Sequence, residues 1–447
     1  MRESAPSTTA PALPVDELCA ALIRFDTTNN GGGVSAGERE IAEYIAGLLS
    51  DSGYEPQIVG PSPERASVVV RIAGEDRALP ALLIHAHTDV VPVEAEQWSV
   101  PPFDGIIRDG YVWGRGAADM KDMAAMTIAT VQDWAVRGIR PRRDIVLAFV
   151  ADEEDRGDYG AGWLAEQRPE LFVGVGAAIG ESGGSPSLVT DARGRQRRLY
   201  AIATAERATM HMRISSTGRS GHGSRPNSDS AVRRLLDATQ RIAQHRWPIH
   251  LSTTVRAFLE RSSAALGFPA ELDTEEGVLR TIDRLGPAGT VARFTVRAST
   301  TPTALSAGGK VNVIPGRAEA LLDVRCPPGY EGQLEREIDR LLGDDATREF
   351  VSLAHSVESS PDSSWFRAME AAIIVHDPEA IVVPFCMGGG TDAKAFTALG
   401  ISCYGFAPLG LDSEGREVHG VHGVDERVPV ESLIGGQRVL ATFLESV

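Results

Sequence analysis

The stretch that decides the fold is Ala81-Leu-Leu-Ile-His-Ala-His-Thr-Asp-Val-Val-Pro92, an apolar run that ends in two histidines and an aspartate. A run of four small or branched apolar residues indicates a buried strand. Because side chains alternate along a strand, His85, His87 and Asp89 would share one face if the strand continued that far. Imidazole and carboxylate groups at the end of a buried strand need a compensating partner, and a metal ion is the simplest one.

Two further apolar runs resemble this one. They lie at residues 144–151 and 175–180, and acidic residues follow both of them, Asp152–Glu154 after the first and Glu181 after the second. Completely apolar strands that alternate with helical patterns are typical of a largely parallel sheet with helices on both faces. Ligands of such sheets bind at the carboxyl ends of the strands. The sequence therefore predicts that these polar residues meet in one crevice of a mixed, largely parallel α/β domain.

The order of the expected elements indicates a large domain with a smaller α+β domain inserted into it. Ser35 and Glu38 form an expected capping box for a helix over 35–52, and Gly138 is the expected end of a helix over 120–137. The character of the sequence changes near residue 200, and residues 250–310 hold few clear elements. We therefore expect a disordered lead-in at 1–14, a catalytic metal-binding domain made of 15–200 and 358–447, and an inserted domain at 201–357.

Bulk properties restrict the function further. A length of 447 residues favours two domains, and a net charge of −17 disfavours nucleic acid as a partner. No apolar stretch approaches the roughly 20 residues of a membrane helix, and the Ser/Thr/Pro-rich N-terminus lacks the apolar core of a signal peptide. The four cysteines show no metal-binding or disulfide spacing. We therefore expect reduced thiols, a cytoplasmic location, and no membrane partner.

A hydrolytic site with two metal ions has three requirements. It needs imidazole or carboxylate ligands, a carboxylate that bridges ions about 3.5–4 Å apart, and a free base that activates water. Ligands of this type without thiolate suit zinc, and also cobalt or manganese. The sequence supplies six candidates: His87, Asp119, Glu153, Glu154, Glu181 and His422. Simpler interpretations exist, because Asp119 could be an N-cap and Asp152–Glu154 a solvated acidic loop.

Seven short motifs occur in an order that resembles one known family. They are HTDVVP at 87–92, GRGAADMK at 114–121, DEE at 152–154, Glu181 after its apolar strand, GHGSRP at 221–226, NVIP at 312–315 and HGVDE at 422–426. From about residue 15 to its C-terminus, the chain resembles the zinc metallo-hydrolases that include aminoacylases, glutamate carboxypeptidases, acetylornithine deacetylase and succinyl-diaminopimelate desuccinylase. One such motif is weak evidence, whereas seven in order are strong.

The resemblance implies a di-zinc exopeptidase-like fold and a role for each candidate. Asp119 would bridge two Zn²⁺, with Co²⁺ or Mn²⁺ as possible substitutes. His87 and Glu181 would complete the first metal site, and Glu154 and His422 the second. Asp89 would accept a hydrogen bond from the other ring nitrogen of His87, and Glu153 would act as general base and then general acid. His419 is a rival ligand, but the family spacing to Glu426 selects His422.

The resemblance also implies that the inserted domain forms the interface of a homodimer. His222 would reach the active site of the other subunit and stabilise the developing oxyanion. The residues expected to contact the substrate, or to bind its carboxylate, are Asn312, Arg325, Gly389, Gly390 and Thr391. Backbone N–H groups at the start of a helix after Gly390 suit an anion.

The function that this predicts is hydrolysis of an amide bond in an N-acyl amino acid or a small peptide with a free carboxylate. The spacing of roughly 90 residues between His222 and Asn312 favours the aminoacylase, carboxypeptidase or dipeptidase side of the family. A biosynthetic deacylase of the acetylornithine or succinyl-diaminopimelate type remains an alternative. So do an esterase or phosphoesterase that uses the same two metals, and a non-catalytic metal-binding relative.

Overall fold

The stretch at 81–87 forms strand β3 (Ala81–His87), whose seven residues are all buried. It lies inside a ten-stranded sheet, between β6 (Ile145–Val150) and β7 (Val175–Gly180), and pairs in parallel with both. The structure, a computed structural model, describes residues 13–416 and 418–447, so nearly all of the expected lead-in lies outside the described residues.

The large sheet is mixed, as the sequence predicts. Its main path runs β1-β2-β6-β3-β7-β18-β9-β16, and β8 and β17 also pair with β9. The four pairings β3–β6, β3–β7, β7–β18 and β9–β17 are parallel. The remaining strands are β1 (Gln57–Val59), β2 (Ser67–Ile72), β8 (Gly183–Thr190), β9 (Gln196–Glu206), β16 (Val357–Glu358), β17 (Ile381–Met387) and β18 (Ser402–Gly405).

Helices cover both faces of this sheet, because alternate residues of its strands belong to two separate apolar cores. Leu82 and Ile84 pack with one set of helices, and Leu83 packs with the other. The first set is α1 (Val15–Ile23), α2 (Arg39–Asp51), α3 (Lys121–Arg137), α10 (Ser364–His376) and α12 (Val430–Ser446), and the second is α4 (Ala161–Gln167) and α11 (Ala393–Thr397). None of the helices in the described residues is both long and apolar enough to cross a membrane.

Two helix boundaries differ in how well the sequence predicts them. Helix α3 ends where expected, at Gly138, which adopts a left-handed conformation with φ of 67°. The expected capping box at Ser35 is wrong, because α2 begins only at Arg39 and the Ser35 hydroxyl accepts from the backbone N–H of Gly37. The Glu38 side chain is instead buried and paired with Arg65.

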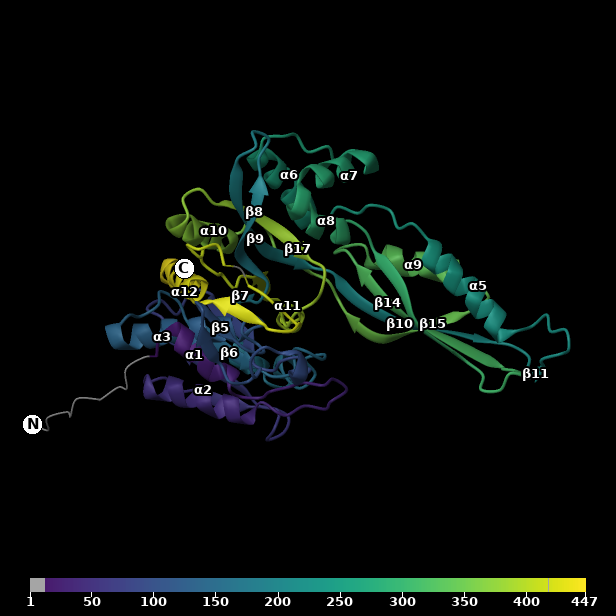
Figure 1. Ribbon diagram of the computed structural model, residues 1–447, viewed down its shortest axis with the longest axis horizontal. Coiled ribbons are helices and arrows are strands. Elements are labelled where there is room, and N and C mark those ends of the chain that lie inside the picture. Colours follow the sequence, from purple (N-terminus) through teal and green to yellow (C-terminus); the bar gives the residue numbers. More distant parts are fainter. Residues whose placement is uncertain (1–12, 417) are drawn as a thin grey trace, which may run out of the picture.

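The smaller domain is a four-stranded antiparallel sheet in the order β12-β14-β10-β15, and it projects away from the large sheet (Figure 1). Helices α5 (Ala231–Gln244) and α9 (Glu331–Leu342) pack on one face of it. The strands are β10 (Ala208–Thr217), β12 (Ser299–Ala307), β14 (Arg317–Cys326) and β15 (Thr347–Ala354). A two-stranded ribbon of β11 (Gly221–His222) and β13 (Val313–Ile314) forms the far tip of this domain in Figure 1.

The expectation of few elements at residues 250–310 is wrong. This segment forms α6 (Thr253–Leu266), α7 (Glu275–Arg284) and α8 (Thr290–Thr295), and the side chains of Ser252 and Thr274 cap the first two. All three helices pack against β8, β9 and β17 of the large sheet. Residues 253–296 therefore belong with the large sheet, although they lie inside the range expected for the inserted domain.

Three short elements complete the part of the chain that positions the site. They form a three-stranded sheet of β4 (Ile106–Arg108), β5 (Tyr111–Trp113) and β19 (Arg427–Pro429), in the order β19-β5-β4. Single 3-10 turns lie at Ala95–Gln97, Pro169–Phe172 and Gly286–Gly289. Because β5 pairs with β19, the segment before α3 lies beside the segment that follows His422.

Candidate active site

The six predicted metal-site and base residues converge on one cluster at the carboxyl ends of the central strands. His87 is the last residue of β3, Glu153 and Glu154 follow β6, and Glu181 directly follows β7. Asp119 precedes α3, and His422 lies in the loop between β18 and β19. Four of the six residues therefore lie at strand ends, as the sequence predicts, whereas Asp119 and His422 lie on loops.

Asp119 lies at the centre of the cluster and faces both halves of it. One of its oxygens, Oδ1, is 3.0 Å from His87 Nε2, which is also 3.4 Å from Glu181 Oε2. The other oxygen, Oδ2, is 3.0 Å from His422 Nε2, and this nitrogen is 3.2 Å from Glu154 Oε2. Two imidazoles therefore point at the two oxygens of one carboxylate, each with a second carboxylate beside it.

This donor set fits two divalent cations. Ligand atoms of His87, Asp119 and Glu154 lie within 4.8 Å of one another, and so do those of His87, Glu153 and Glu181. Among the residues that the structure describes, Glu154 Oε1 has no hydrogen-bond partner, although a buried carboxylate oxygen ordinarily has one. Nitrogen and oxygen donors without sulfur are the ligands of zinc and similar divalent ions.

The electrostatics of the cluster fit the binding of cations. Burial and the neighbouring Glu181 raise the pKa of Glu153 well above its usual value. Burial alone would lower the pKa of His87, but its contacts with Asp119 and Glu181 outweigh burial and raise it. Contacts with Asp119 and Glu154 raise the pKa of His422 to about 10. A cation bound among these groups would neutralise the same carboxylates.

Asp89 supports the cluster in a different way from the one expected. The acceptor nearest to His87 Nδ1 is the backbone carbonyl of Asp89, at 2.9 Å, whereas its carboxylate oxygen is 3.7 Å away. The carboxylate instead accepts from the backbone N–H groups of Glu153 and Glu154, each at 3.1 Å. Asp89 therefore joins the strand end of His87 to the turn that carries both glutamates.

Glu426 connects the two loops that bring Asp119 and His422 together. Its carboxylate pairs with Arg115 and accepts from the backbone N–H groups of Gly116, at 3.0 Å, and Ala118, at 2.8 Å. The segment that carries His422 and Glu426 is therefore held against the loop that ends in Asp119. This contact gives a physical reason for the four-residue spacing between His422 and Glu426.

His85 of the opening stretch and the rival ligand His419 both lie outside the cluster. His85 packs against the ring of Phe396, and burial lowers its pKa to about 3, so it is neutral at ordinary pH. His419 exchanges backbone hydrogen bonds with Arg427 and lies beside Tyr111. The structure therefore brings His422 into the cluster and leaves His419, on the same loop, paired with β19 outside the cluster.

His222 and Asn312 lie together, but not with the metal cluster of the same chain. His222 is exposed on the ribbon at the tip of the small domain, where its Nδ1 is 2.8 Å from the hydroxyl of Ser224 (Figure 1). The carbonyl of Asn312 accepts from the N–H of Gly223 at 2.9 Å. The two sequence motifs thus form one unit, and β11 is distant in Figure 1 from β6, β7 and α3, whose ends carry cluster residues.

The residues expected to bind a carboxylate lie where the two domains join. Arg325 donates to Asp323 and to the Thr209 hydroxyl, which also accepts from Lys394 at 3.2 Å. Lys394 is in α11 (Ala393–Thr397), the helix expected after Gly390, which follows the turn that contains Gly389, Gly390 and Thr391.

Two neighbouring residues that no sequence pattern singles out hold this turn. Arg207 donates from Nε and Nη2 to the carbonyl of Gly388, at 3.1 and 3.0 Å. Glu206 accepts from both the N–H and the hydroxyl of Thr391, at 3.0 and 2.5 Å. Both hydrogen-bond donors of Thr391 are therefore engaged by Glu206. Glu206 and Arg207 together fix the two ends of the turn. Glu206 and Arg207 lie where β9 passes into β10, and this position becomes apparent only in the folded chain.

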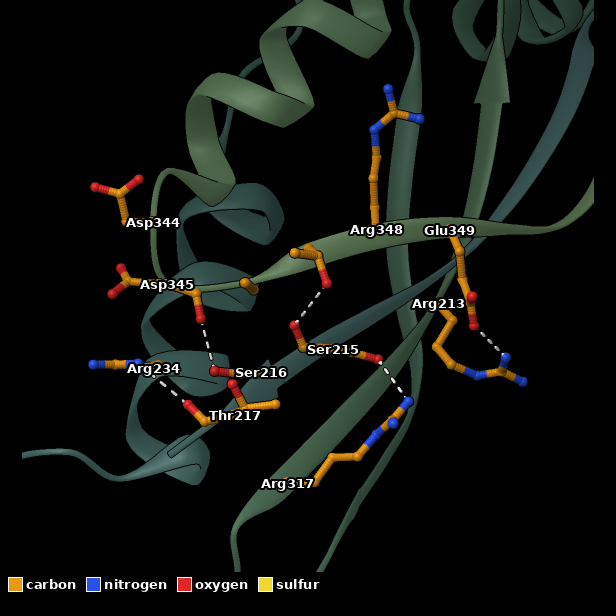
Figure 2. A pocket seen from close by; sticks show the side chains of 12 residues that line it. Arg213, Ser215, Ser216, Thr217, Arg234, Arg317, Asp344, Asp345, Arg348 and Glu349 are labelled. Atoms are coloured by element: carbon orange, nitrogen blue, oxygen red, sulfur yellow. Dashed lines mark hydrogen bonds and ion pairs between the residues drawn. The ribbon is translucent and has the colours of Figure 1, made fainter. Parts of the chain in front are cut away.

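A separate cavity of 340 Å³ lies on the small domain and does not belong to the cluster (Figure 2). Its lining includes Arg213, Arg234, Arg317 and Arg348, and each of these arginines pairs with a carboxylate. None of the predicted site residues is among those that line it. Its charges are largely balanced, so it offers no strong anion site.

Comparison with known proteins identifies the family. The pattern of peptidase family M20/M25/M40 matches residues 83–446, which include the whole cluster. The chain belongs to this family. Pig aminoacylase-1 is 30% identical over 366 residues, which cover 80% of this chain and 78% of that protein. Human N-fatty-acyl-amino acid synthase/hydrolase PM20D1 is 29% identical over 395 residues, which cover 86% and 77%.

A solved structure shares the fold over nearly the whole chain. The M20 family metallo-carboxypeptidase Sso-CP2 from Sulfolobus solfataricus superposes with a TM-score of 0.68 at 16% identity, covering 96% of this chain and 98% of that one. The mixed α/β fold predicted from the sequence is thereby confirmed. The chain is a metal-dependent hydrolase of the M20 family.

Proposed function

We propose that this M20 hydrolase cleaves the amide bond of N-acyl amino acids or small peptides that carry a free carboxylate. The observation that carries the proposal is the cluster around Asp119, whose two oxygens face His87 and His422, with Glu153 beside it. The relatives named as aminoacylase and N-fatty-acyl-amino acid synthase/hydrolase support acyl amino acids as the substrate class.

The cluster would hold two Zn²⁺, with His87 and Glu181 on one side, Glu154 and His422 on the other, and Asp119 between them. When bound, such ions polarise the amide carbonyl and lower the pKa of water. Nitrogen and carboxylate donors alone also admit Co²⁺ or Mn²⁺.

Glu153 is the proposed general base and acid. Its carboxylate would accept a proton from the attacking water and return it to the nitrogen of the leaving amine. Burial and the neighbouring Glu181 raise the pKa of Glu153 above its usual value. Asp89 holds the backbone of Glu153 in place, so its role is to position this group.

The substrate carboxylate would lie at the junction of the domains, near Arg325 and the turn of Gly389 and Gly390. Arg325 and Lys394 share the Thr209 hydroxyl, so two positive charges are held close together there. His222 and Asn312 would be supplied by a second copy of the chain, since their tip is far from the cluster of its own chain (Figure 1). We therefore propose a homodimer formed through the inserted domain, and a cytoplasmic location consistent with four buried, unpaired cysteines.

A turnover screen tests this function. The zinc-loaded protein would be assayed on N-acetyl and longer N-acyl amino acids, dipeptides, and N-acetylated or N-succinylated diamino acids. Hydrolysis of the first two groups is expected, and amidation of the substrate carboxylate should abolish it. Selective turnover of the diamino acid derivatives would instead establish a biosynthetic deacylase. No turnover of any amide by protein with two bound metals would contradict the proposal.

A further inference from the structure

A buried polar network that includes residues outside the family motifs supports the turn that carries Glu153 and Glu154. At its centre is Asp152, whose side chain is buried and whose backbone is left-handed, with φ of 68°. An L-residue rarely adopts this conformation without surrounding contacts that hold it. The residue directly before both proposed functional glutamates is therefore held in a conformation that its neighbours must maintain.

Asn29 provides one of these contacts from the loop after α1. Its side-chain amide donates to Asp89 Oδ2, at 2.9 Å, and to Asp152 Oδ1, at 3.1 Å. Asn29 is 2% exposed, and its backbone N–H donates to the carbonyl of Val90. One NH₂ group thus bridges two buried carboxylates that would otherwise repel each other.

Arg65 provides the second contact from the segment before β2. Its guanidinium donates to both oxygens of Glu38, at 2.9 and 3.0 Å, and to Asp152 Oδ1, at 2.7 Å. The guanidinium also lies over the ring of Tyr159. The backbone N–H of Tyr159 donates to Asp152 Oδ2 at 3.0 Å. Both oxygens of Asp152 are therefore fixed by donors on three separate segments.

The network continues to the cluster through Asp89. The carboxylate that accepts from Asn29 also accepts from the N–H groups of Glu153 and Glu154. A displacement of Asp152 or Asp89 would thus be passed directly to the backbone of both glutamates. Errors of about 1 Å in the position of a reacting group can cost roughly a hundredfold in rate.

We propose that Asn29 and Arg65 are positioning residues of the reaction, which hold the Asp152–Glu154 turn so that Glu153 and Glu154 face the metals. The inference rests on the proposed function, because it assumes that Glu153 is the base and Glu154 a ligand. Neither Asn29 nor Arg65 touches the cluster itself; both act through Asp152, and Asn29 also through Asp89.

Two conservative variants test the proposal in the full-length, zinc-loaded protein. Asn29→Ser keeps one donor, which can serve only one of the two carboxylates, and Arg65→Lys keeps the charge but loses the planar fork. Each should lower kcat about tenfold to a hundredfold, leave KM within about twofold, and retain the metal content of the wild type. The combined variant should lose less than the product of the two effects, because both residues act on Asp152 Oδ1.

Matched controls separate positioning from general damage. Asn30→Ser changes the exposed neighbour of Asn29, and Arg71→Lys changes an arginine of β2 that pairs with Asp144. Both controls should keep wild-type kcat. Wild-type kcat in Asn29→Ser and Arg65→Lys would overturn the proposal, and so would a loss of bound metal that accounts for the loss of rate. If Asn29→Ser does not fold, Arg65→Lys alone decides.

A second readout separates this inference from the proposed function. The visible spectrum of the Co²⁺-substituted protein reports the ligand geometry around the ions and needs no substrate. A changed spectrum in Arg65→Lys, but not in Arg71→Lys, supports the inference, and an unchanged one overturns it. Failure of the proposed function would instead appear as wild-type turnover in Glu153→Gln, or as no turnover by the wild type on any amide.

Discussion

The metal cluster and the ribbon that carries His222 are built in opposite ways. The cluster is assembled within one chain from the ends of β3, β6 and β7 and from two loops, and its carboxylates are largely buried. The ribbon of β11 and β13 is exposed at the tip of the small domain, far from that cluster (Figure 1). One chain therefore supplies all the proposed metal ligands, whereas the proposed oxyanion contact would require a second chain.

This difference indicates which property each region controls. Residues around Asp119 are expected to determine metal binding and proton transfer. Residues on the ribbon and at the domain junction are expected to determine how substrate is held. The predictions below separate these two groups by measuring kcat, KM and metal content for the same variants.

The largest effect is expected for Glu153→Gln. This variant keeps the shape of the side chain but removes the carboxylate that would transfer the proton, so kcat should fall about a thousandfold. Two metals per chain should remain, since the proposed ligands are untouched. Steady-state kinetics and metal analysis check this, with Glu166→Gln on α4 as a remote control. Near wild-type kcat would remove Glu153 from the base role.

A smaller effect is expected for His222→Ala. Loss of one oxyanion donor should lower kcat about a hundredfold without changing the metal content. Mixing this variant with Glu153→Gln should restore activity, because one site of each mixed dimer combines an intact Glu153 with an intact His222 from the other chain. Random exchange would recover about a quarter of the wild-type rate. No recovery in dimers shown to have exchanged would mean that His222 does not act across subunits.

How far the sequence predicts these regions depends on whether the determining contacts are local. His87, Glu153 and Glu181 are predictable because each follows an apolar strand, and the ends of neighbouring parallel strands meet. His422 is on an irregular loop, so only the family spacing to Glu426 selects it. Asn29 and Arg65 have no local pattern, because their role comes from contacts with Asp152 across 123 and 87 positions of the chain.

The helices at residues 253–295 were missed for a related reason. Helix α6 carries an apolar stripe of Val255, Phe258, Leu259 and Leu266, but it also buries Thr254, Ser262 and Ser263 completely, and these polar residues weaken the pattern in the sequence. Its capping residues, Ser252 and Gly267, were the usable signals. Strand β3, in contrast, begins with four apolar residues in a row and is buried along its whole length. Its prediction as a buried strand is confirmed.

The smallest effect is expected at the domain junction, from Arg207→Lys. Arg207 holds the Gly388 carbonyl with two N–H groups and the Phe294 carbonyl with a third, at 2.8 Å, whereas a lysine cannot reproduce this fork. The turn beside the proposed carboxylate site should loosen, which raises KM about fivefold to tenfold and leaves kcat within about twofold.

Arg197→Lys is the matched control, because Arg197 is on the same strand β9 and, within residues 13–416 and 418–447, its side chain donates only to the Glu379 carbonyl, at 3.5 Å. Its KM should equal that of the wild type. A substrate amidated at its carboxylate sharpens the test, since Arg207→Lys should not weaken its already poor binding any further. If Arg207→Lys lowered kcat with unchanged KM, the junction would act on the chemistry as the cluster does, and the proposed separation between the two regions would fail.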